Sequence, residues 1–357
     1  MNYYGIDLHS DQFTVAQLNQ DDKFNLFKFS VSPIGIESFK KMLSKGDTVG
    51  FESSTNAFYF HDQLANCVSS CKVINPKKFK VIYESTSKTD KKDAKTIAKF
   101  LKLDIIPEVY VPTSEIRELR TYFSSYLLFN KIKVISKNRV CSLLKQNGIS
   151  LKREKVFSSK NREAILNLDL PKSFIFQINL FYQQVDFAER QLEFLTEQIY
   201  LCGEHFKKEV EILTSQPGIS VFIALGIIAD IAEIKRFANQ RKFTSYLGSA
   251  PRVDTTNKTV HIGGIHKDSR KLARTLMTQS IKHFRDSSEH LEKFYQFKIK
   301  GKSKGKVRMA IIRKMMVAIY WMLRNKKYSR YRNPVNHDRK LKEYNKILER
   351  LHNTYLG

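Results

Sequence analysis

The order of short apolar runs at the start of the chain constrains its fold more than any other feature. Three runs of strand-forming residues lie close together, at Tyr3–Leu8, Phe13–Leu18 and Phe24–Phe29. Helix and strand patterns then alternate, at Pro33–Leu43, Thr48–Phe51, Asn56–Val68 and Lys72–Asn75. Three strands joined by hairpins and followed by alternating helices and strands predict a mixed sheet with helices packed on it, an α/β fold.

Four acidic residues occupy positions that suit a shared site. Asp7 ends the first predicted strand, and Glu52 directly follows a later one, where acids are otherwise disfavoured. Asp90 and Asp93 lie on one face of a predicted helix over 88–103. Carboxylates that converge repel one another unless cations neutralise them, and Mg²⁺ prefers oxygen ligands. We therefore expect a Mg²⁺ site, with two ions that assist phosphoryl transfer and that Mn²⁺ can replace. The alternative is that the acids are exposed and pair with nearby lysines.

Beyond this region the pattern is mostly helical. Long helical patterns cover residues 115–147 and about 176–202. The second pattern carries a heptad-like apolar seam, formed by Phe181, Val185, Ala188, Leu192, Leu195 and Ile199. The seam fits either a helix that packs on its own core or a coiled-coil arm that joins two copies of the chain.

The C-terminal part has a different texture. Residues 246–270 are polar and contain glycine, which predicts a loop or hairpin between helices, and the residues from Asn325 onward look peripheral. We predict four regions: an α/β domain at 1–112, a helical dimerisation arm at 113–208, a mainly helical domain at 209–325 and a basic extension at 326–357.

The composition narrows the classes of function. The 357 residues include 62 Lys and Arg against 35 Asp and Glu, a net charge of +27, which favours a polyanion such as nucleic acid as partner. Hydrophobic residues make up 42%, enough for ordinary cores, so the chain is not a disordered basic tail. No apolar stretch is long enough to span a membrane and no secretory signal is visible, so we expect a cytoplasmic protein without a membrane partner. The nine histidines show no spacing typical of metal ligands.

Segments spread along the whole chain resemble those of one known family. In the first half they are Tyr4-Gly5-Ile6-Asp7, Phe51-Glu52-Ser53-Ser54, Val73-Ile74-Asn75-Pro76 and Lys88-Thr89-Asp90-Lys91-Lys92-Asp93-Ala94. In the second half they are Leu213-Thr214-Ser215-Gln216-Pro217-Gly218-Ile219, the stretch from Phe243 to Arg252, and Gly264-Ile265-His266-Lys267. In this order they resemble the RuvC-like DEDD transposases of insertion-sequence family 110, which includes bridge-RNA-guided recombinases and pilin-gene invertases.

The resemblance implies a fold, a reaction and a set of site residues. The reaction would be that of a DNA recombinase, a transposase or site-specific invertase, which cuts and rejoins DNA strands through Mg²⁺-dependent attack of a hydroxyl side chain on phosphate. The fold would be a RuvC-like (RNase H-like) mixed sheet with helices, a helical coiled-coil arm and a mainly helical C-terminal transposase domain. Asp7, Glu52, Asp90 and Asp93 would be the metal-binding catalytic acids. The family places a serine nucleophile five residues after the proline of its Pro-Arg segment, and counting from Pro251 gives Thr256.

The threonine leaves three alternatives open. Thr256 can act as the nucleophile, because its hydroxyl has the same chemistry once it is activated. A neighbour such as Thr255, Thr259 or Ser269 can take that role if the loop is shifted. In the third alternative the covalent step is lost or altered.

The expected partners are DNA, a structured guide RNA and further copies of the chain, as a homodimer or homotetramer. The implied site of action is the bacterial cytoplasm, at the nucleoid. The candidate nucleic-acid-binding residues are Lys77, Lys78, Lys88, Lys91, Lys92, Arg252, Lys267, Arg270, Lys302, Lys306 and Arg313. Two rival functions remain: a RuvC-like structure-specific endonuclease that cuts with activated water, and a non-catalytic nucleic-acid-binding protein derived from a transposase.

Overall fold

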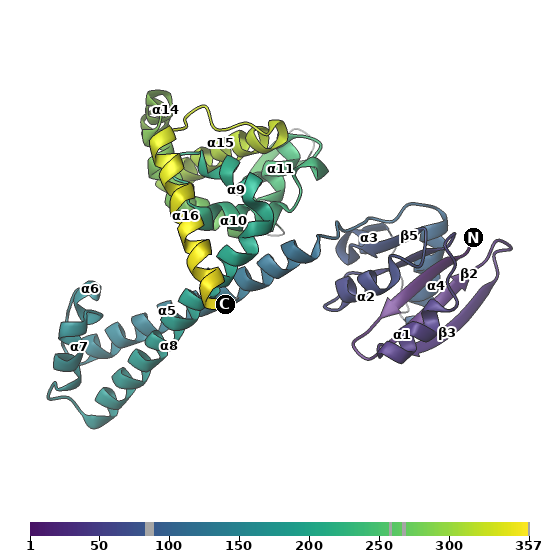
Figure 1. Ribbon diagram of the computed structural model, residues 1–357, viewed down its shortest axis with the longest axis horizontal. Helices are drawn as coiled ribbons and strands as arrows, with labels where there is room; N and C mark the ends of the chain where they lie inside the picture. Colours follow the sequence, from purple (N-terminus) through teal and green to yellow (C-terminus); the bar gives the residue numbers. More distant parts are fainter. Residues whose placement is uncertain (83–88, 257–258, 266–268, 356–357) are drawn as a thin grey trace. The chain divides into compact units, whose positions relative to one another are not determined.

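The computed structural model describes residues 1–82, 89–256, 259–265 and 269–355. The chain forms two compact units, Met1–Pro112 and Thr113–Gly357 (Figure 1). Each unit buries hydrophobic cores of its own.

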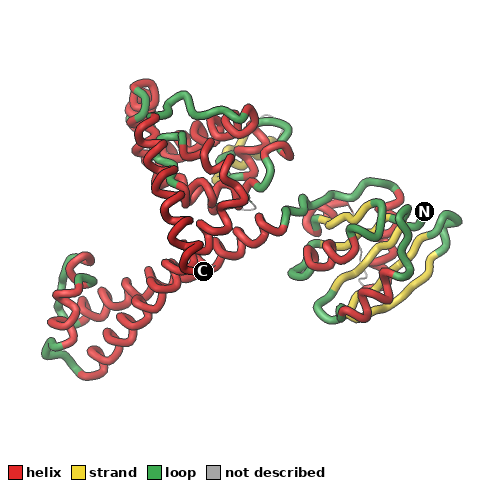
Figure 2. The backbone as a smooth tube through the Cα atoms, in the orientation of Figure 1, coloured by secondary structure: helices red, strands yellow, loops and turns green. Residues whose placement is uncertain are grey.

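A five-stranded sheet forms the centre of the first unit. Its strands are β1 (Tyr3–Leu8), β2 (Gln12–Leu18), β3 (Phe24–Ser30), β4 (Thr48–Glu52) and β5 (Ser70–Ile74). They lie in the order β3-β2-β1-β4-β5 (Figure 2). β1, β2 and β3 pair antiparallel, whereas β4 is parallel to both β1 and β5. The prediction of a mixed sheet is therefore confirmed.

Different helices cover the two faces of this sheet. The helices of the unit are α1 (Pro33–Lys40), α2 (Ala57–Leu64), α3 (Pro76–Ile82) and α4 (Asp90–Lys102). Tyr4 and Ile6 pack in one core with α1 and α2, which contribute Phe39 and Phe60. Side chains alternate along a strand, so Gly5 and its neighbours at odd positions face the other side, where α4 crosses β1.

The second unit is almost entirely helical. Its helices are α5 (Ser114–Gln146), α6 (Arg153–Val156), α7 (Ser159–Leu166), α8 (Lys172–Cys202), α9 (Lys207–Thr214), α10 (Val221–Ile231), α11 (Gln240–Tyr246), α12 (Leu272–Met277), α13 (Ile281–Asp286), α14 (Glu289–Ile299), α15 (Lys304–Asn325) and α16 (Pro334–Tyr355). A two-stranded hairpin, β6 (Pro251–Thr256) and β7 (Thr259–Ile265), lies between α11 and α12.

Helices α5 and α8 pack along each other and form an arm, with α6 and α7 near its far end (Figure 1). Just after α5, Gly148 adopts a φ of +77°. Its N–H donates to the Lys145 carbonyl oxygen at 3.0 Å, and the Ile149 N–H donates to the Leu144 carbonyl oxygen at 3.0 Å, which closes the end of the helix. The seam predicted on α8 is mostly buried inside the chain, as at Ala188 and Ile199. The helix α8 therefore uses this seam to pack within its own chain, which is the first of the two predicted alternatives.

The remaining helices share one large core. The Ala- and Ile-rich helix α10 is buried along nearly its whole length, and α15 contributes a row of apolar side chains that includes Ile312 and Met315. Tyr344 and Leu348 of α16 belong to the same core. The expectation that the residues from Asn325 onward are peripheral is wrong, because one face of α16 packs these two side chains into the core. None of the described helices combines the length and the apolarity needed to cross a membrane.

Candidate active site

A glycine sets how closely α4 approaches the sheet. A Cβ atom on Gly5 would stand 2.1 Å from the carbonyl oxygen of Ala94 and 2.3 Å from the backbone nitrogen of Ala98. Contacts that short do not occur, so α4 can lie against β1 only because position 5 has no side chain. This close crossing carries the first turn of α4 to the end of β1, where Asp7 lies.

The first turn of α4 is capped and carries two acids. The Thr89 hydroxyl accepts a hydrogen bond from the backbone N–H of Lys92 at 3.3 Å. Asp90 and Asp93 lie in this first turn, where the helix dipole stabilises negative charge. The cap fixes the start of α4, and the dipole offsets part of the repulsion between its two acids and Asp7.

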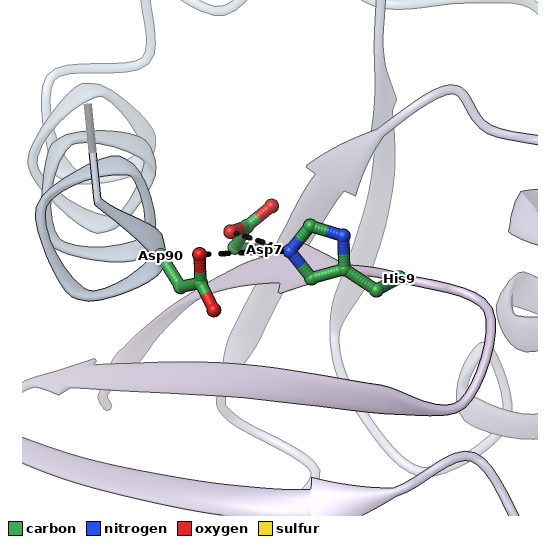
Figure 3. A group of neighbouring side chains, drawn as sticks. All are labelled: Asp7, His9 and Asp90. Atoms are coloured by element: carbon green, nitrogen blue, oxygen red, sulfur yellow. Dashed lines mark ion pairs between the residues drawn. The ribbon is translucent and has the colours of Figure 1, made fainter.

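Asp7, His9 and Asp90 gather at the end of β1 (Figure 3). The His9 Nε2 lies 3.2 Å from an Asp7 carboxylate oxygen and 3.7 Å from one of Asp90. One ligand atom from each of the three side chains lies within 4.8 Å of the other two. Both carboxylates thus face the same imidazole nitrogen, and they approach each other closely enough to share a cation.

Asp7 is the least exposed member of this group. Its side chain is 23% exposed, against 47% for Asp90 and 49% for His9. Burial raises the pKa of Asp7 above its usual range, and the charges of Asp90 and Asp93 raise it further, while His9 opposes them. A divalent cation at this place would relieve the repulsion among the carboxylates.

The structure brings the four predicted acids to the same end of the sheet but not into one tight group. Phe51 of β4 pairs with Ile6 of β1, so the next residues, Glu52 and Asp7, occupy matching positions on neighbouring parallel strands. Among the described residues, the group within 4.8 Å contains neither Glu52 nor Asp93. Asp93 nevertheless lies close enough for its charge to act on Asp7. The metal-binding role of the four acids stays a prediction.

Carboxylate oxygens are the donors that Mg²⁺ and Mn²⁺ prefer, so the residues present fit such an ion. His9 was not foreseen from the sequence, because it follows the strand and no second histidine stands at metal-ligand spacing. Its one signal is its position two residues after Asp7, which places both side chains on the same face of an extended chain.

The other predicted site residues lie on both units. Lys77 and Lys78 are exposed on α3, and Lys91 and Lys92 are exposed on α4. In the second unit Arg270, Lys302, Lys306 and Arg313 are exposed. Lys88 and Lys267 lie outside the described residues.

Thr256 is the last residue of β6 and pairs with Thr259, the first residue of β7. Arg252 lies on the same strand. The structure describes the backbone of the two strands but not the side chains of residues 252–262, so the nucleophile assignment stays a prediction.

A sheet in the order β3-β2-β1-β4-β5, with acids at the ends of β1 and β4 and at the start of α4, defines a RuvC-like phosphoryl-transfer domain. Residues 4–148 match the DEDD transposase model of insertion-sequence family 110, and residues 210–296 match the family described as "Transposase IS116/IS110/IS902 family". No match to a curated protein accompanies these two. The two matched regions cover more than half of the chain, which belongs to the DEDD transposases of insertion-sequence family 110: enzymes that cut DNA and whose acids imply a divalent metal.

Proposed function

We propose that this transposase is a Mg²⁺-dependent DNA recombinase that cuts and rejoins strands through a covalent protein–DNA intermediate. The observation that carries the proposal is the approach of Asp7 and Asp90 at His9 Nε2. The close packing of α4 on Gly5 makes this approach possible. Such a cluster is costly without a cation and useful with one, because a metal ion draws phosphate oxygens to the same place.

Asp7 and Asp90 would hold the metal, with Asp93 and Glu52 beside them. Bound Mg²⁺ supplies Lewis-acid polarisation of the scissile phosphate. His9 keeps the two carboxylates aligned through its Nε2 contacts. Lys91 and Lys92, exposed on the same helix turn as the acids, would attract the DNA backbone.

Thr256 is our candidate nucleophile. Its hydroxyl oxygen would attack the phosphorus, the bond from phosphorus to the 3′ oxygen would break, and that oxygen would take up the proton. The product is a 5′-phosphothreonine linkage and a free 3′ hydroxyl. The position of Thr256 at the end of β6, five residues after Pro251, supports this role because it matches the place of the family's serine.

We also propose that a structured guide RNA selects the DNA, and that the protein acts in the bacterial cytoplasm at the nucleoid. The net charge of +27 supports an assembly that holds several strands at once. A homodimer or homotetramer is supported by an outward apolar stripe on α8, which is separate from the buried seam: Phe176, Leu180, Phe187 and Phe194 are 69%, 51%, 48% and 48% exposed.

A trapping experiment tests the covalent step. The protein is incubated with Mg²⁺, guide RNA transcribed from the flanking DNA, and cognate DNA labelled on the 3′ side of the cleavage site, the side that stays joined to the protein. The adduct is sought on a denaturing gel. We expect an adduct that Thr256→Ala abolishes and Thr256→Ser retains, with Thr255→Ala and Thr259→Ala as matched controls. An adduct that survives Thr256→Ala assigns the nucleophile to another residue.

The threonine at position 256, where the family has a serine, favours a second candidate function. A RuvC-like endonuclease that cuts with water needs the acids and no hydroxyl side chain. Cleavage without an adduct in the same experiment would favour this enzyme, and DNA binding without cleavage would favour a binding protein.

A further inference from the structure

A groove in the second unit is lined by apolar and basic side chains, in contrast to the cluster of acids around Asp7. It has a volume of about 730 Å³ and lies between α13, α14, α15 and the loop that follows α15. Most of its lining lies beyond residue 296, where the region matched by the family model ends. We propose that this groove binds an unpaired nucleotide of a single DNA strand.

The floor of the groove is apolar and its aromatic side chains are accessible. Phe284, Leu291 and Met322 line it and are buried. Trp321 and Tyr328 also line it, yet they remain 48% and 43% exposed. Exposed rings above an apolar floor offer a nucleobase a surface on which to stack, and such stacking is largely independent of sequence.

Positive charge surrounds this apolar floor. Arg313, Lys314, Lys327 and Arg330 line the groove, and none of the lining residues that the structure describes is acidic. An apolar ligand would gain nothing from four cations. A nucleotide uses both parts, because its base stacks and its phosphates pair with the cations.

The groove is held in shape without a ligand. The backbone N–H of Ser329 donates to the Ser215 hydroxyl at 2.9 Å, and the Ser329 hydroxyl bonds Gln216 Oε1 at 2.9 Å. These contacts fix the loop wall to the turn before α10. On the opposite wall the Lys314 Nζ lies 4.5 Å from the centre of the Phe294 ring. A preformed site loses less entropy on binding.

DNA is the favoured source of the nucleotide because it is the substrate of this family. The inference rests on the proposed recombinase function in one respect: strands that are exchanged must leave their partners, and unpaired bases then need a place to bind. A duplex cannot offer a free base face to such a groove.

The chain's single tryptophan makes the groove directly measurable. Trp321 fluorescence is followed while a short oligothymidylate is added to the full-length protein without Mg²⁺. We expect strong quenching by the single strand, and little by an abasic strand of the same length or by the duplex.

Charge-neutral variants localise the effect. Arg313→Gln and Lys314→Gln should each weaken binding about fivefold or more. Each should also make the negative slope of log affinity against log salt shallower by about 0.7. Lys131→Gln, an exposed lysine on α5 outside the groove, is the matched control and should bind like the wild type.

Four results would overturn the proposal. The first is binding of the strand, seen by anisotropy, without a change in Trp321 fluorescence. The second and third are equal quenching by the abasic strand and equal quenching by an acidic peptide. The fourth is tighter binding of the matching RNA, which would make RNA the occupant. Because the titration involves no cleavage, Asp7→Asn should titrate like the wild type. Failure here and failure of the adduct experiment are therefore separate results.

Discussion

Gly5 and Ala94 meet so closely that a side chain on the first would collide with the backbone of the second, at 2.1 Å between a Cβ and the carbonyl oxygen. The contact joins the strand that carries Asp7 to the helix that carries Asp90 and Asp93. The glycine two residues before Asp7 therefore sets the spacing of the acids.

Gly5→Ala should push α4 away from β1. We expect a loss of about 1–3 kcal/mol in the free energy of unfolding, as for other overpacked cores. We also expect about a 100-fold loss of DNA cutting, since displacement of a catalytic group by about 1 Å can cost that much. Urea unfolding and a cleavage assay measure the two effects. Gly46→Ala is the matched control, because a Cβ there meets nothing within 4 Å; equal losses in both variants would contradict the account.

Thr89→Ala should remove the cap of α4. The expected loss is about 1 kcal/mol of stability, with weaker metal-dependent activity because the first turn that carries Asp90 frays. Thr89→Ser keeps a hydroxyl at the same place and should restore both. If alanine and serine behave alike in thermal unfolding, the hydroxyl does not contribute as described.

Asp7 should make the metal-free protein less stable as pH rises. Its pKa is raised in the folded protein above the ordinary 3.8, so the folded state holds the proton more tightly than the unfolded state. The contribution of Asp7 to stability is therefore greatest below its ordinary pKa and is lost as pH rises through the raised pKa. Asp7→Asn should be more stable than the wild type at neutral pH without metal, and it should lose the stabilisation by Mg²⁺.

Thermal unfolding with and without Mg²⁺ measures this difference. Asp11→Asn, which changes an exposed acid in the turn after β1, is the control and should keep the response to Mg²⁺. A response to Mg²⁺ that survives in Asp7→Asn would place the metal elsewhere.

His337 should impose an opposite dependence on pH. It is buried, its Nδ1 accepts a hydrogen bond from Arg332 Nε at 2.9 Å, and its Nε2 lies 2.9 Å from the Glu211 carbonyl oxygen. Burial lowers its pKa below the ordinary 6.5, so the imidazole is neutral in the fold. The stabilisation is present above pH 6.5 and is lost as pH falls through the lowered value.

Replacing His337 should flatten this part of the stability curve. We expect His337→Gln to show less acid destabilisation than the wild type between neutral pH and pH 5, measured by thermal unfolding. His205→Gln, at an exposed position in the same unit, should leave the curve unchanged. A wild-type curve that is flat over this range would contradict the assignment.

The outward stripe on α8 should mediate assembly. Phe187→Lys with Phe194→Lys should shift the protein to monomers in light scattering, because charges replace apolar side chains at two exposed positions. Glu209→Lys, which adds a lysine at an exposed position on α9, is the control. A wild-type protein that is already monomeric would contradict the dimer.

Strands and long helices could be predicted from the sequence, because each leaves a local pattern. The apolar runs of β1 and α10 are examples, and the acids at strand ends followed from the same reasoning. His9 could not be predicted in the same way, since its partner Asp90 is brought beside it by the crossing of α4. The groove around Trp321 was missed because its walls come from separate helices and a loop that share no motif.

The seam on α8 shows a further limit. Its spacing predicted a partner helix but not whether that helix belongs to the same chain. α5 supplies that partner, and the stripe that stays exposed lies on another face of α8. Periodicity indicates that one face of a helix is buried, but only the fold shows which element covers that face.

The proposed role of Asp7 and Asp90 is to hold the metal for cutting DNA. The most direct measurement compares wild type, Asp7→Asn and Asp11→Asn for Mg²⁺-dependent cleavage of cognate DNA, with DNA affinity measured in parallel. We predict that Asp7→Asn loses cleavage entirely while it binds DNA within about twofold of the wild type, and that Asp11→Asn retains both. Cleavage by Asp7→Asn at the wild-type rate would contradict the account.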